Sequence, residues 1–495
     1  MRADSAAGID GIPVRVLKLP ELAPALTSVL NNHCCLGGDA TASAAPHWRI
    51  SMIVSIPKSV GSTNLDNQRG IALECSVPKL LNAVLRNRLL PVLDPILLGL
   101  QSGFRPGRCA VEQIAAIRSV IDSCRTRQRA VSIVFVDFRK AFDSVSRSSI
   151  PQLLAAYGVP SVLIAATMDL YQDSTAFVRT RDGPTASFST SSGVLQGDTL
   201  APLLFVLVVD FVLRRCLRDE DSYILAHRRS SRNPAVNLPA LAYADDVALL
   251  CRNPTAAQRA LTRLCQEAAR VGLEVNARKT KVLHVGFDTT QDLLLPNGEF
   301  ISTCEDFSYL GSRLMNPDSI IAERKAQAWR AAFLLRSLFN SAAKDEWKIR
   351  LFRSAVEPIL LYSLEAVPLT PSRERVLDAS YRRMLRYALG IHFPERLSSQ
   401  RLKLRTGVPP ISNTLRRRRQ MLLGHCLRRH GRGEVNPLAL TLVHLPTERL
   451  RRGHGRTVTL ASTFISDLKC IDLTPLSAST CPSALFRQRV RARLS

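Results

Sequence analysis

Two adjacent aspartates, Asp245 and Asp246, lie in the apolar stretch LAYADDVALL at positions 241–250. The apolar residues on either side predict two short buried strands, which places the aspartates at a tight turn between them. Ionised carboxylates in such a position need a compensating charge, because burial of an unpaired charge has a large desolvation cost. A divalent cation with oxygen ligands, such as Mg²⁺, meets that need. For this stretch taken alone, a solvated Asp-Asp turn is the alternative interpretation.

A third aspartate, Asp137, follows the β-branched run AVSIVFV at 130–136, which predicts a buried strand with a carboxylate at its end. If that strand and the Asp-Asp hairpin are neighbours in one sheet, the three carboxylates suit two Mg²⁺ ions. One ion would lower the pKa of a primer 3′-hydroxyl, and the other would neutralise a pyrophosphate leaving group. Phosphoryl-transfer reactions of this kind depend mainly on positioning and charge stabilisation, so few other groups are required.

The composition points to a folded protein with an anionic partner. The 495 residues carry a formal net charge of +26, and 46% of them are hydrophobic. This length and hydrophobicity predict about two to four subdomains with sizeable cores. The positive charge favours a polyanion, most commonly nucleic acid. A solvated basic surface, or attraction to a membrane surface, is the alternative.

The cysteines and the apolar segments indicate an intracellular protein without a membrane span. Twelve cysteines without a CxxC pair argue against a disulfide framework or a zinc ribbon. The first residues, MRADSAAGIDGIP, lack the layout of a signal peptide. The most apolar run, 200–213, is too short to span a bilayer and contains Asp210, so it predicts a buried helix.

Hydrophobic periodicity predicts the elements that would position the aspartates. Strands or hairpins are expected at 48–57, 130–136, 177–190, 273–275 and 282–285. Helices are expected at 79–98, 111–125, 150–171, 200–218 and 255–271. From residue 320 onward the chain predicts long helices rich in Arg and Lys, so the composition change near residue 315 is the clearest boundary.

Several motifs resemble those of one enzyme family. VFVDFRKAFDSV, SSGVLQGDTLAPLLF, LAYADDVAL, GLEVNARKTK and FSYLG resemble, in order, motifs A to E of reverse transcriptases. WRISMIVSIPK, NQRGIAL, KLLNAVLRNRL and QSGFRPGR resemble the fingers motifs of non-LTR (LINE-type) retrotransposon polymerases. The resemblance runs from about residue 8 to residue 315, and later helical segments look like the thumb and tail of such elements.

The resemblance implies an α/β (α+β) right-hand polymerase fold. Its expected parts are a fingers region at 1–129, a palm with an antiparallel sheet, helices and motifs A to E at 130–315, a helical thumb at 316–395, and a basic, Arg-rich helical C-terminal region at 396–495. Arg-rich helices beyond residue 315 would contact the backbone phosphates of an RNA–DNA duplex.

Residue by residue, the resemblance implies three roles. The catalytic, metal-binding carboxylates would be Asp137, Asp245 and Asp246. The nucleotide site would comprise the phosphate-gripping Lys58 and Arg69, the backbone amides of Phe138 and Arg139, the sugar-selecting Phe142, the lining residues Gln196 and Gly197, and Lys279 as a candidate general acid for pyrophosphate. The primer grip would be Tyr309, Leu310 and Gly311. The alternatives are solvated surface charges for the cations, a core aromatic for Phe142 and a purely structural hairpin at 309–311.

The implied activity is RNA-directed DNA polymerisation in the nucleus and cytoplasm. The expected partners are an RNA template, a DNA primer or target and deoxynucleoside triphosphates, without a membrane. The expected cofactor is two Mg²⁺ ions, for which Mn²⁺ is a possible substitute. A catalytically inactive RNA-binding relic and a maturase-like splicing factor are alternatives on the same fold.

The sequence also departs from the family pattern. Gln68 stands where the family usually has Tyr. No upstream endonuclease, downstream ribonuclease H or C-terminal CCHC finger is recognisable in these 495 residues. We therefore expect the chain to be part of a longer or eroded element with its catalytic residues intact.

Overall fold

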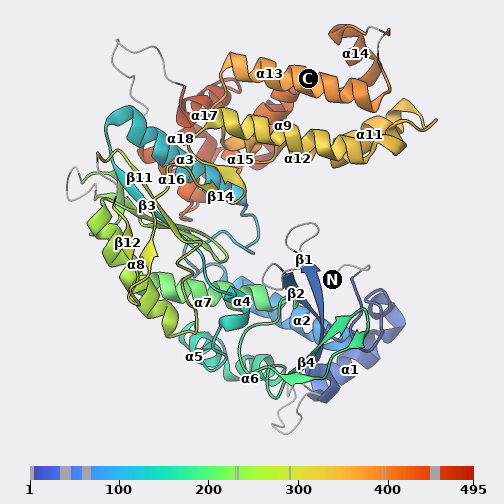
Figure 1. Ribbon diagram of the computed structural model, residues 1–495, viewed down its shortest axis with the longest axis vertical. Helices are drawn as coiled ribbons and strands as arrows, with labels where there is room; N and C mark the ends of the chain where they lie inside the picture. The colour runs from blue at the N-terminus through green and yellow to red at the C-terminus, as the bar shows by residue number, and fades with distance from the viewer. Residues whose placement is uncertain are drawn as a thin grey trace.

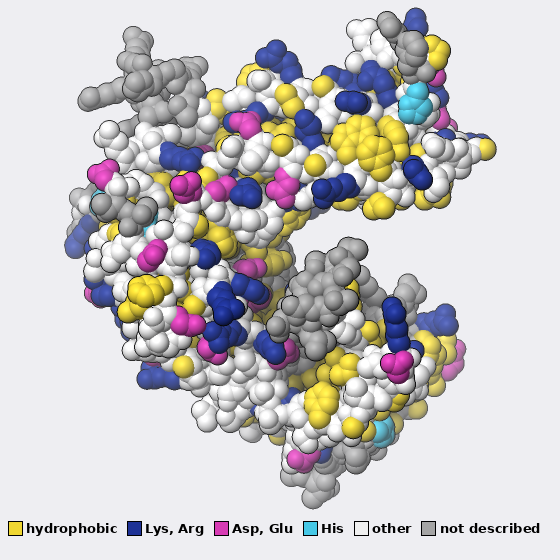
Figure 2. Space-filling view, in the orientation of Figure 1, with side chains coloured by type: hydrophobic (Ala, Val, Ile, Leu, Met, Phe, Trp, Pro, Cys, Tyr) yellow, Lys and Arg dark blue, Asp and Glu magenta, His cyan; other side chains and the backbone are white. Residues whose placement is uncertain are grey.

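The computed structural model describes residues 5–33, 46–57, 68–228, 230, 234–288, 291–392, 394–395, 397–445 and 458–494. Figure 1 shows a C-shaped molecule, in which the four-stranded sheet region lies on the closed side. A bundle of helices forms one arm, and a smaller lobe with a second sheet forms the other. The space-filling view in Figure 2 shows an open cleft between the two arms.

The central sheet has the order β11-β3-β10-β9, with every neighbouring pair antiparallel. Its strands are β3 (Val131–Val136), β9 (Ala240–Tyr243), β10 (Asp246–Cys251) and β11 (Lys281–Val285). β3 is buried along its whole length, as its β-branched and aromatic residues predict. Two helices pack against the sheet, α3 (Ala110–Arg127) and α8 (Pro254–Ala269), and α7 (Ala201–Cys216) packs against α8.

A second sheet forms the smaller lobe, in the order β2-β1-β4-β5, with β6 also paired to β4. Its strands are β1 (Ile50–Pro57), β2 (Gln68–Leu73), β4 (Thr175–Thr180), β5 (Gly183–Pro184) and β6 (Phe188–Ser189). β1 pairs antiparallel with β2 and parallel with β4. This sheet therefore joins strands from the ranges 1–129 and 130–315, and the domain boundaries drawn from the sequence stay a prediction.

Most helices in and beside the smaller lobe are short, and α2 is the longest of them. They are η1 (Val16–Lys18), η2 (Pro20–Leu22), α1 (Ala23–His33), η3 (Pro46–Arg49), α2 (Ser76–Leu93), α4 (Ala141–Ser144), α5 (Ser149–Ala156) and α6 (Ser161–Asp169). The sequence predicted one helix over 150–171, but the structure has two. Gly158 has a positive φ of 78° and Pro160 caps α6, and these two residues end α5 and redirect the chain.

The helical arm has its own hydrophobic core. It contains α9 (Pro317–Leu334), α10 (Arg336–Phe339), α11 (Asp345–Ala355), α12 (Glu357–Leu361), η5 (Leu364–Ala366), α13 (Pro371–Ala388) and α14 (Ser399–Thr406). Phe339, Phe352 and Tyr381 are among its buried side chains. Small hairpins complete the chain between these parts: β7 (Tyr223–Ala226) with β8 (Val236–Leu238), β12 (Leu293–Leu294) with β13 (Phe300–Ile301), and β14 (Ser308–Tyr309) with β15 (Ser312–Arg313).

The predicted α/β (α+β) right-hand fold, with an antiparallel palm sheet and a helical thumb, is confirmed. Among the described residues, no helix combines the length and apolarity that a bilayer crossing requires. The apolar run at 200–213 lies within α7, and its Asp210 accepts hydrogen bonds from the Leu98 amide and the Tyr157 hydroxyl.

The C-terminal helices are part of the main core and do not form a separate tail. They are α15 (Ile411–Gly431), α16 (Pro437–His444), α17 (Leu460–Lys469), α18 (Pro475–Thr480) and α19 (Ser483–Leu494). Leu423, Phe464 and Phe486 belong to the same buried cluster as β3 and β10. Arg419 of α15 is only 1% exposed and pairs with Asp467 of α17 at 2.5 Å. Arg419 therefore lies in the core, although it belongs to an Arg-rich stretch of the sequence.

Replacement of Arg419 by Ala should strongly destabilise these helices, because the buried Asp467 carboxylate loses that partner. We expect the free energy of unfolding to fall by about 3 kcal/mol or more, measured by urea denaturation followed with circular dichroism. Arg417→Ala is the matched control, because Arg417 is exposed on the same helix and its loss should be almost neutral. Equal effects of the two substitutions would contradict the structural role of Arg419.

Candidate active site

The Asp-Asp sequence lies at the turn of the β9–β10 hairpin. Tyr243 pairs with Asp246, so Ala244 and Asp245 form a two-residue turn. Ala244 has a φ of 57°, in the left-handed region that tight hairpin turns require and that residues other than Gly adopt rarely. The predicted hairpin is therefore present, and its turn uses a disfavoured backbone conformation.

Asp137 lies beside this hairpin. Val136 on β3 pairs with Val247 on β10. Because the two strands are antiparallel, the next residues along, Asp137 and Asp246, face each other at the same end of the sheet. The backbone of Asp137 is held in turn by Thr280, whose hydroxyl accepts from the Asp137 amide at 3.1 Å. Two of the three predicted carboxylates are thus neighbours on the central strands.

The carboxylates repel each other. Desolvation of the Asp246 carboxylate by the surrounding protein raises its pKa to about 6, and the negative charges of Asp245 and Asp137 add to this effect. Lys279 supplies a nearby positive charge, since its Nζ atom lies 3.8 Å from Oδ2 of Asp137. The predicted Lys279 therefore lies at the acidic cluster, although its side chain is largely exposed.

A cavity of about 230 Å³ opens between the ends of β3 and β10 and the β14 strand. Asp137, Asp246, Lys279 and Tyr309 line it, together with Phe135, Val136, Val247 and Phe307. Tyr309 is 2% exposed, and burial and the Asp246 charge raise the pKa of its hydroxyl far above the ordinary value. Asp245 is not part of this lining.

The donor atoms of this site fit a hard divalent cation. Carboxylate oxygens are the ligands that Mg²⁺ prefers, and a bound cation would offset both the burial of the Asp246 charge and its repulsion by the neighbouring carboxylates. In the part of the chain that the structure describes, no three His, Cys, Asp or Glu side chains are gathered closely enough to form an ion site by themselves. Asp137 and Asp246 are therefore the candidate ligands on the cavity wall, and the full three-carboxylate set stays a prediction.

Gln196 and Gly197 lie against the second sheet. The Ala72 amide of β2 donates to the Gln196 carbonyl at 2.6 Å. A Cβ atom on Gly197 would lie 2.4 Å from the Ala72 carbonyl oxygen, and the φ of Gly197 is 123°, so only glycine fits. Arg69 is exposed on the same strand β2. The structure thus brings these predicted nucleotide-site residues onto one loop and one strand, while Lys58 lies outside the described residues.

Phe142 is half-buried between two aromatic rings. It stacks on Phe205 of α7, with ring centroids 4.4 Å apart, and meets Phe104 edge-on at 6.1 Å. The Val194 amide donates to the Phe142 carbonyl, which ties it to the loop that carries Gln196. The geometry is compatible with both a core aromatic and a wall of the nucleotide site.

The Arg139 amide is hydrogen-bonded within the protein. That amide donates to the Glu274 carbonyl at 2.8 Å, and the guanidinium pairs with Glu274 at 3.0 Å and Glu299 at 3.6 Å. The Arg139 amide therefore already has a backbone acceptor, and its role in the triphosphate site stays a prediction. Phe138 is buried and forms an isolated bridge with Val275, so its side chain belongs to the core.

The predicted primer grip is attached to the helical arm. Leu310 and Gly311 form the turn between β14 and β15, both with positive φ. The Tyr362 hydroxyl donates to the Leu310 carbonyl at 2.9 Å, and the Arg324 guanidinium donates to the Gly311 carbonyl. Sequence reasoning did not identify Arg324 or Tyr362, because each is one polar residue in an ordinary helical pattern.

Comparisons with known proteins agree with these motifs. Residues 56–314 match the family model described as reverse transcriptase (RNA-dependent DNA polymerase). The chain is 26% identical over 471 residues to the "Retrovirus-related Pol polyprotein from type-1 retrotransposable element R2" of Popillia japonica, covering 92% of this chain and 62% of that protein. It is 30% identical over 237 residues to the type-2 R2DM polyprotein of Drosophila melanogaster, covering 47% of this chain and 21% of that protein. The chain thus spans less than two thirds of these relatives.

Two further similarities concern another transposon and a solved structure. The chain is 29% identical over 336 residues to the "Probable RNA-directed DNA polymerase from transposon BS" of Drosophila melanogaster, covering 64% of this chain and 36% of that protein. A structure of telomerase from Candida tropicalis with a fragment of telomeric RNA aligns with 92% of this chain and 65% of that one, at 11% identity and a TM-score of 0.38.

Replacement of Asp246 by Asn should raise the melting temperature of the metal-free protein at pH 7.5. The Asp246 pKa is raised on folding, so its ionised form destabilises the folded state above about pH 6, and this penalty disappears as the pH falls toward 4. The gain should therefore shrink between pH 7.5 and pH 5, measured by thermal melting in EDTA. Asp182→Asn, at an exposed turn, is the control. A gain in melting temperature that is absent, or equal at both pH values, would show that ionised Asp246 does not destabilise the folded state.

Proposed function

Because this chain belongs to the reverse transcriptase family, in the form found in non-LTR retrotransposons, we propose that it is an RNA-directed DNA polymerase that extends a DNA primer on an RNA template. The observation that supports this most directly is the pair Asp137 and Asp246, which face each other across two central strands and line one cavity. Deoxynucleoside triphosphates would be the small substrates. Copying at a chromosomal target would take place in the nucleus.

Members of this family use divalent metal ions. In this chain Asp137 and Asp246, with Asp245 beside them, would hold two Mg²⁺ ions, and Mn²⁺ would be a substitute. Bound there, the metal would lower the pKa of the primer 3′-hydroxyl and stabilise the negative charge of the leaving pyrophosphate. Lys279 lies next to Asp137 and would donate a proton to the pyrophosphate or neutralise its charge.

The incoming nucleotide would lie between the central sheet and the second sheet. Arg69 on β2 would contact the triphosphate, and the backbone at Gln196 and Gly197 would approach the nucleotide closely, since Gly197 has no side chain. Phe142 would form the floor under the sugar and would exclude a 2′-hydroxyl by contact. Tyr309, Leu310 and Gly311 would position the primer end, supported from the helical arm by Tyr362 and Arg324.

The charge distribution supports a nucleic-acid duplex as the occupant of the cleft. The chain has a net charge of +26, and Figure 2 shows Lys and Arg side chains on the helical arm and on the sheet region beside the cleft. Contacts of this kind with phosphates tolerate any base sequence and weaken steeply as the salt concentration rises. An RNA template paired to a growing DNA strand fits this surface.

The proposed activity is tested by primer extension on poly(rA)/oligo(dT) with Mg²⁺. Wild-type protein should extend the primer, and Asp137→Asn, Asp245→Asn or Asp246→Asn should each reduce the rate at least about 100-fold, because metal-ion catalysis contributes several kcal/mol. Asp182→Asn should leave the rate unchanged. RNA binding without extension by the wild type would identify the non-catalytic relic, and equal extension by wild type and all three variants would exclude this active site.

Replacement of Phe142 by Ala should allow ribonucleotides into the product. The ring would no longer contact the sugar, so the preference for deoxynucleotides should fall by about tenfold or more, measured as the ratio of kcat/KM for dTTP and UTP. Phe188→Ala removes an exposed ring from β6 and should preserve the preference. Unchanged discrimination in the Phe142→Ala protein would assign this ring to the core alone.

A further inference from the structure

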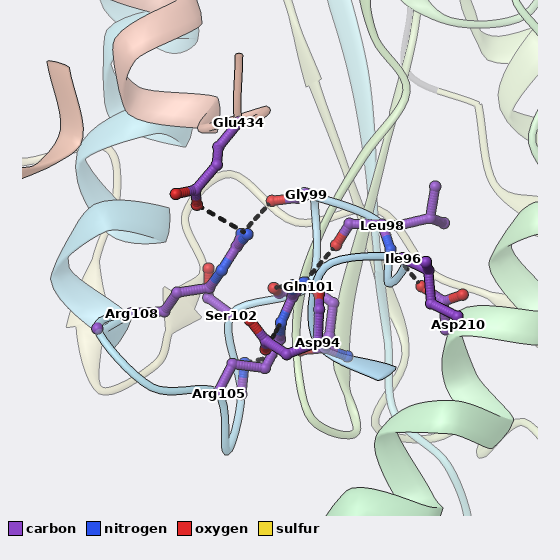
Figure 3. A network of polar contacts seen from close by, with 12 residues as sticks. Asp94, Ile96, Leu98, Gly99, Gln101, Ser102, Arg105, Arg108, Asp210 and Glu434 are labelled. Atoms are coloured by element: carbon purple, nitrogen blue, oxygen red, sulfur yellow. Dashed lines mark hydrogen bonds and ion pairs between the residues drawn. The ribbon is translucent and has the colours of Figure 1, made fainter. Parts of the chain in front are cut away.

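A loop from a distant part of the sequence packs against the back of the Asp-Asp hairpin. It follows α2 and precedes α3, and Figure 3 shows its polar contacts. Gln101 forms a parallel bridge with Ala242 of β9. The Ser102 amide donates to the Ala242 carbonyl at 2.8 Å, and the Ala242 amide donates to the Leu100 carbonyl at 3.1 Å. The loop therefore extends the edge of the central sheet.

The Gln101 side chain binds the one strained residue of the hairpin. It is completely buried, and its Oε1 atom accepts from the Ala244 amide at 2.9 Å. Its Nε2 atom donates to the Ala244 carbonyl at 3.3 Å. Ala244 is the left-handed residue directly before Asp245. A single side-chain amide thus satisfies both backbone groups of the residue that directly precedes the two aspartates.

The loop backbone also approaches Ala244 closely. The Gly103 amide donates to the same Gln101 Oε1 atom at 2.8 Å. A Cβ atom on Gly103 would lie 2.2 Å from the Ala244 nitrogen, so any larger residue would displace the hairpin. Gln101 and Gly103 together leave Ala244 little freedom to move.

The loop is itself held by charged hydrogen bonds, which makes it a rigid support. Arg105 is buried and donates from Nε to Asp94 Oδ1 at 2.7 Å, and from Nη1 to the carbonyls of Leu98 at 2.7 Å and Gln101 at 3.1 Å. Arg108 donates to the Gly99 carbonyl at 2.6 Å (Figure 3). Bonds with a charged donor are roughly twice as strong as neutral ones. Movement of Gln101 would therefore break several strong interactions.

The far end of the loop is bound by helix α15. Arg429 Nη1 donates to the Gly107 carbonyl at 2.9 Å, and His425 Nε2 lies 2.6 Å from the same oxygen. Glu434 pairs with Arg429 at 2.6 Å and lies 4.0 Å from Arg108, as Figure 3 shows for Arg108 and Glu434. The Arg-rich C-terminal region thus fixes the loop that supports the catalytic hairpin.

We propose that Gln101 is a positioning residue, which holds Ala244 in its left-handed conformation and thereby directs the Asp245 and Asp246 carboxylates toward the metal site. The inference rests on the proposed function. Glutamine presents a neutral acceptor and a donor together at every pH, as the Ala244 amide and carbonyl require, whereas a glutamic acid of the same length does so only when it is protonated. A displacement of about 1 Å at a reacting group can cost about 100-fold in rate, so support of this kind has a large effect on catalysis.

The test uses the full chain with Gln101→Met, which keeps the size but removes all three side-chain hydrogen bonds, two with Ala244 and one with Gly103. We expect kcat for nucleotide addition to fall by about 30- to 100-fold and KM for the nucleotide to stay within about twofold, since Gln101 does not contact the nucleotide site. Mn²⁺ affinity, measured without substrate by electron paramagnetic resonance, should fall by about tenfold, as is typical when support for a metal ligand is lost.

A second variant, Gln101→Glu, gives a readout that loss of stability alone would not produce. When protonated, the new carboxyl can both donate and accept; when ionised, it cannot donate to the Ala244 carbonyl and it repels Asp245 and Asp246. Its activity relative to wild type should therefore fall as the pH rises from 6 to 8.5. A constant ratio across this range would count against the proposed hydrogen bonds.

Gln420→Ala is the matched control. Gln420 is also completely buried and donates one hydrogen bond, to the Asp467 carbonyl at 2.8 Å, far from the hairpin in sequence. Its loss should lower the melting temperature without changing kcat or Mn²⁺ affinity. Gln101→Met with wild-type kcat and Mn²⁺ affinity would overturn the inference. If the wild type failed to extend a primer but Gln101→Met still weakened Mn²⁺ binding, the proposed function would fail while the positioning role stood.

Discussion

The structure depends on keeping three like charges at one end of a buried sheet. Burial is the largest cause of the rise in the Asp246 pKa to about 6, and repulsion by the Asp245 and Asp137 carboxylates adds to it. A flexible chain would relieve this repulsion by moving the carboxylates apart. The fold opposes that movement with a fully buried central strand, a paired hairpin and a loop bonded to its turn. The stability of the surrounding core is what allows an unfavourable charge cluster to persist.

Long-range polar contacts also connect the sheet region to the helical arm. Arg118 of α3 is 1% exposed and donates to the carbonyls of Ala366, at 2.9 Å, and Arg313. The Arg313 carbonyl lies in β15, directly before the arm in sequence, and the Ala366 carbonyl lies in η5 within the arm. Together with Tyr362 and Arg324, Arg118 fixes the β14–β15 hairpin between the sheet and the arm. A change in the arm angle would therefore move the predicted primer grip as well.

Much of this arrangement could be predicted from local sequence. The apolar runs next to the aspartates identified the β9–β10 hairpin and the strand before Asp137, because a buried strand ending in a carboxylate leaves a clear local pattern. Gln101 could not be found in this way, because its partner Ala244 lies 143 residues away and a lone glutamine has no periodic signature. The ion pairs of Arg139 and Arg419 could not be predicted either. Sequence alone suggests that each arginine is a solvated surface charge, because its acidic partner becomes a neighbour only in the folded structure.

The packing of α15 to α19 onto the sheet region has a consequence for how the protein is made. Leu423, Leu438, Phe464 and Phe486 complete the same hydrophobic cluster that contains β3, and Arg429 anchors the loop behind the hairpin. The core therefore cannot close until helices α15 to α19 have been synthesised. Contacts between residues so distant in sequence also make folding slow. A nascent chain interrupted before α15 would leave apolar residues of this cluster exposed to chaperones and proteases.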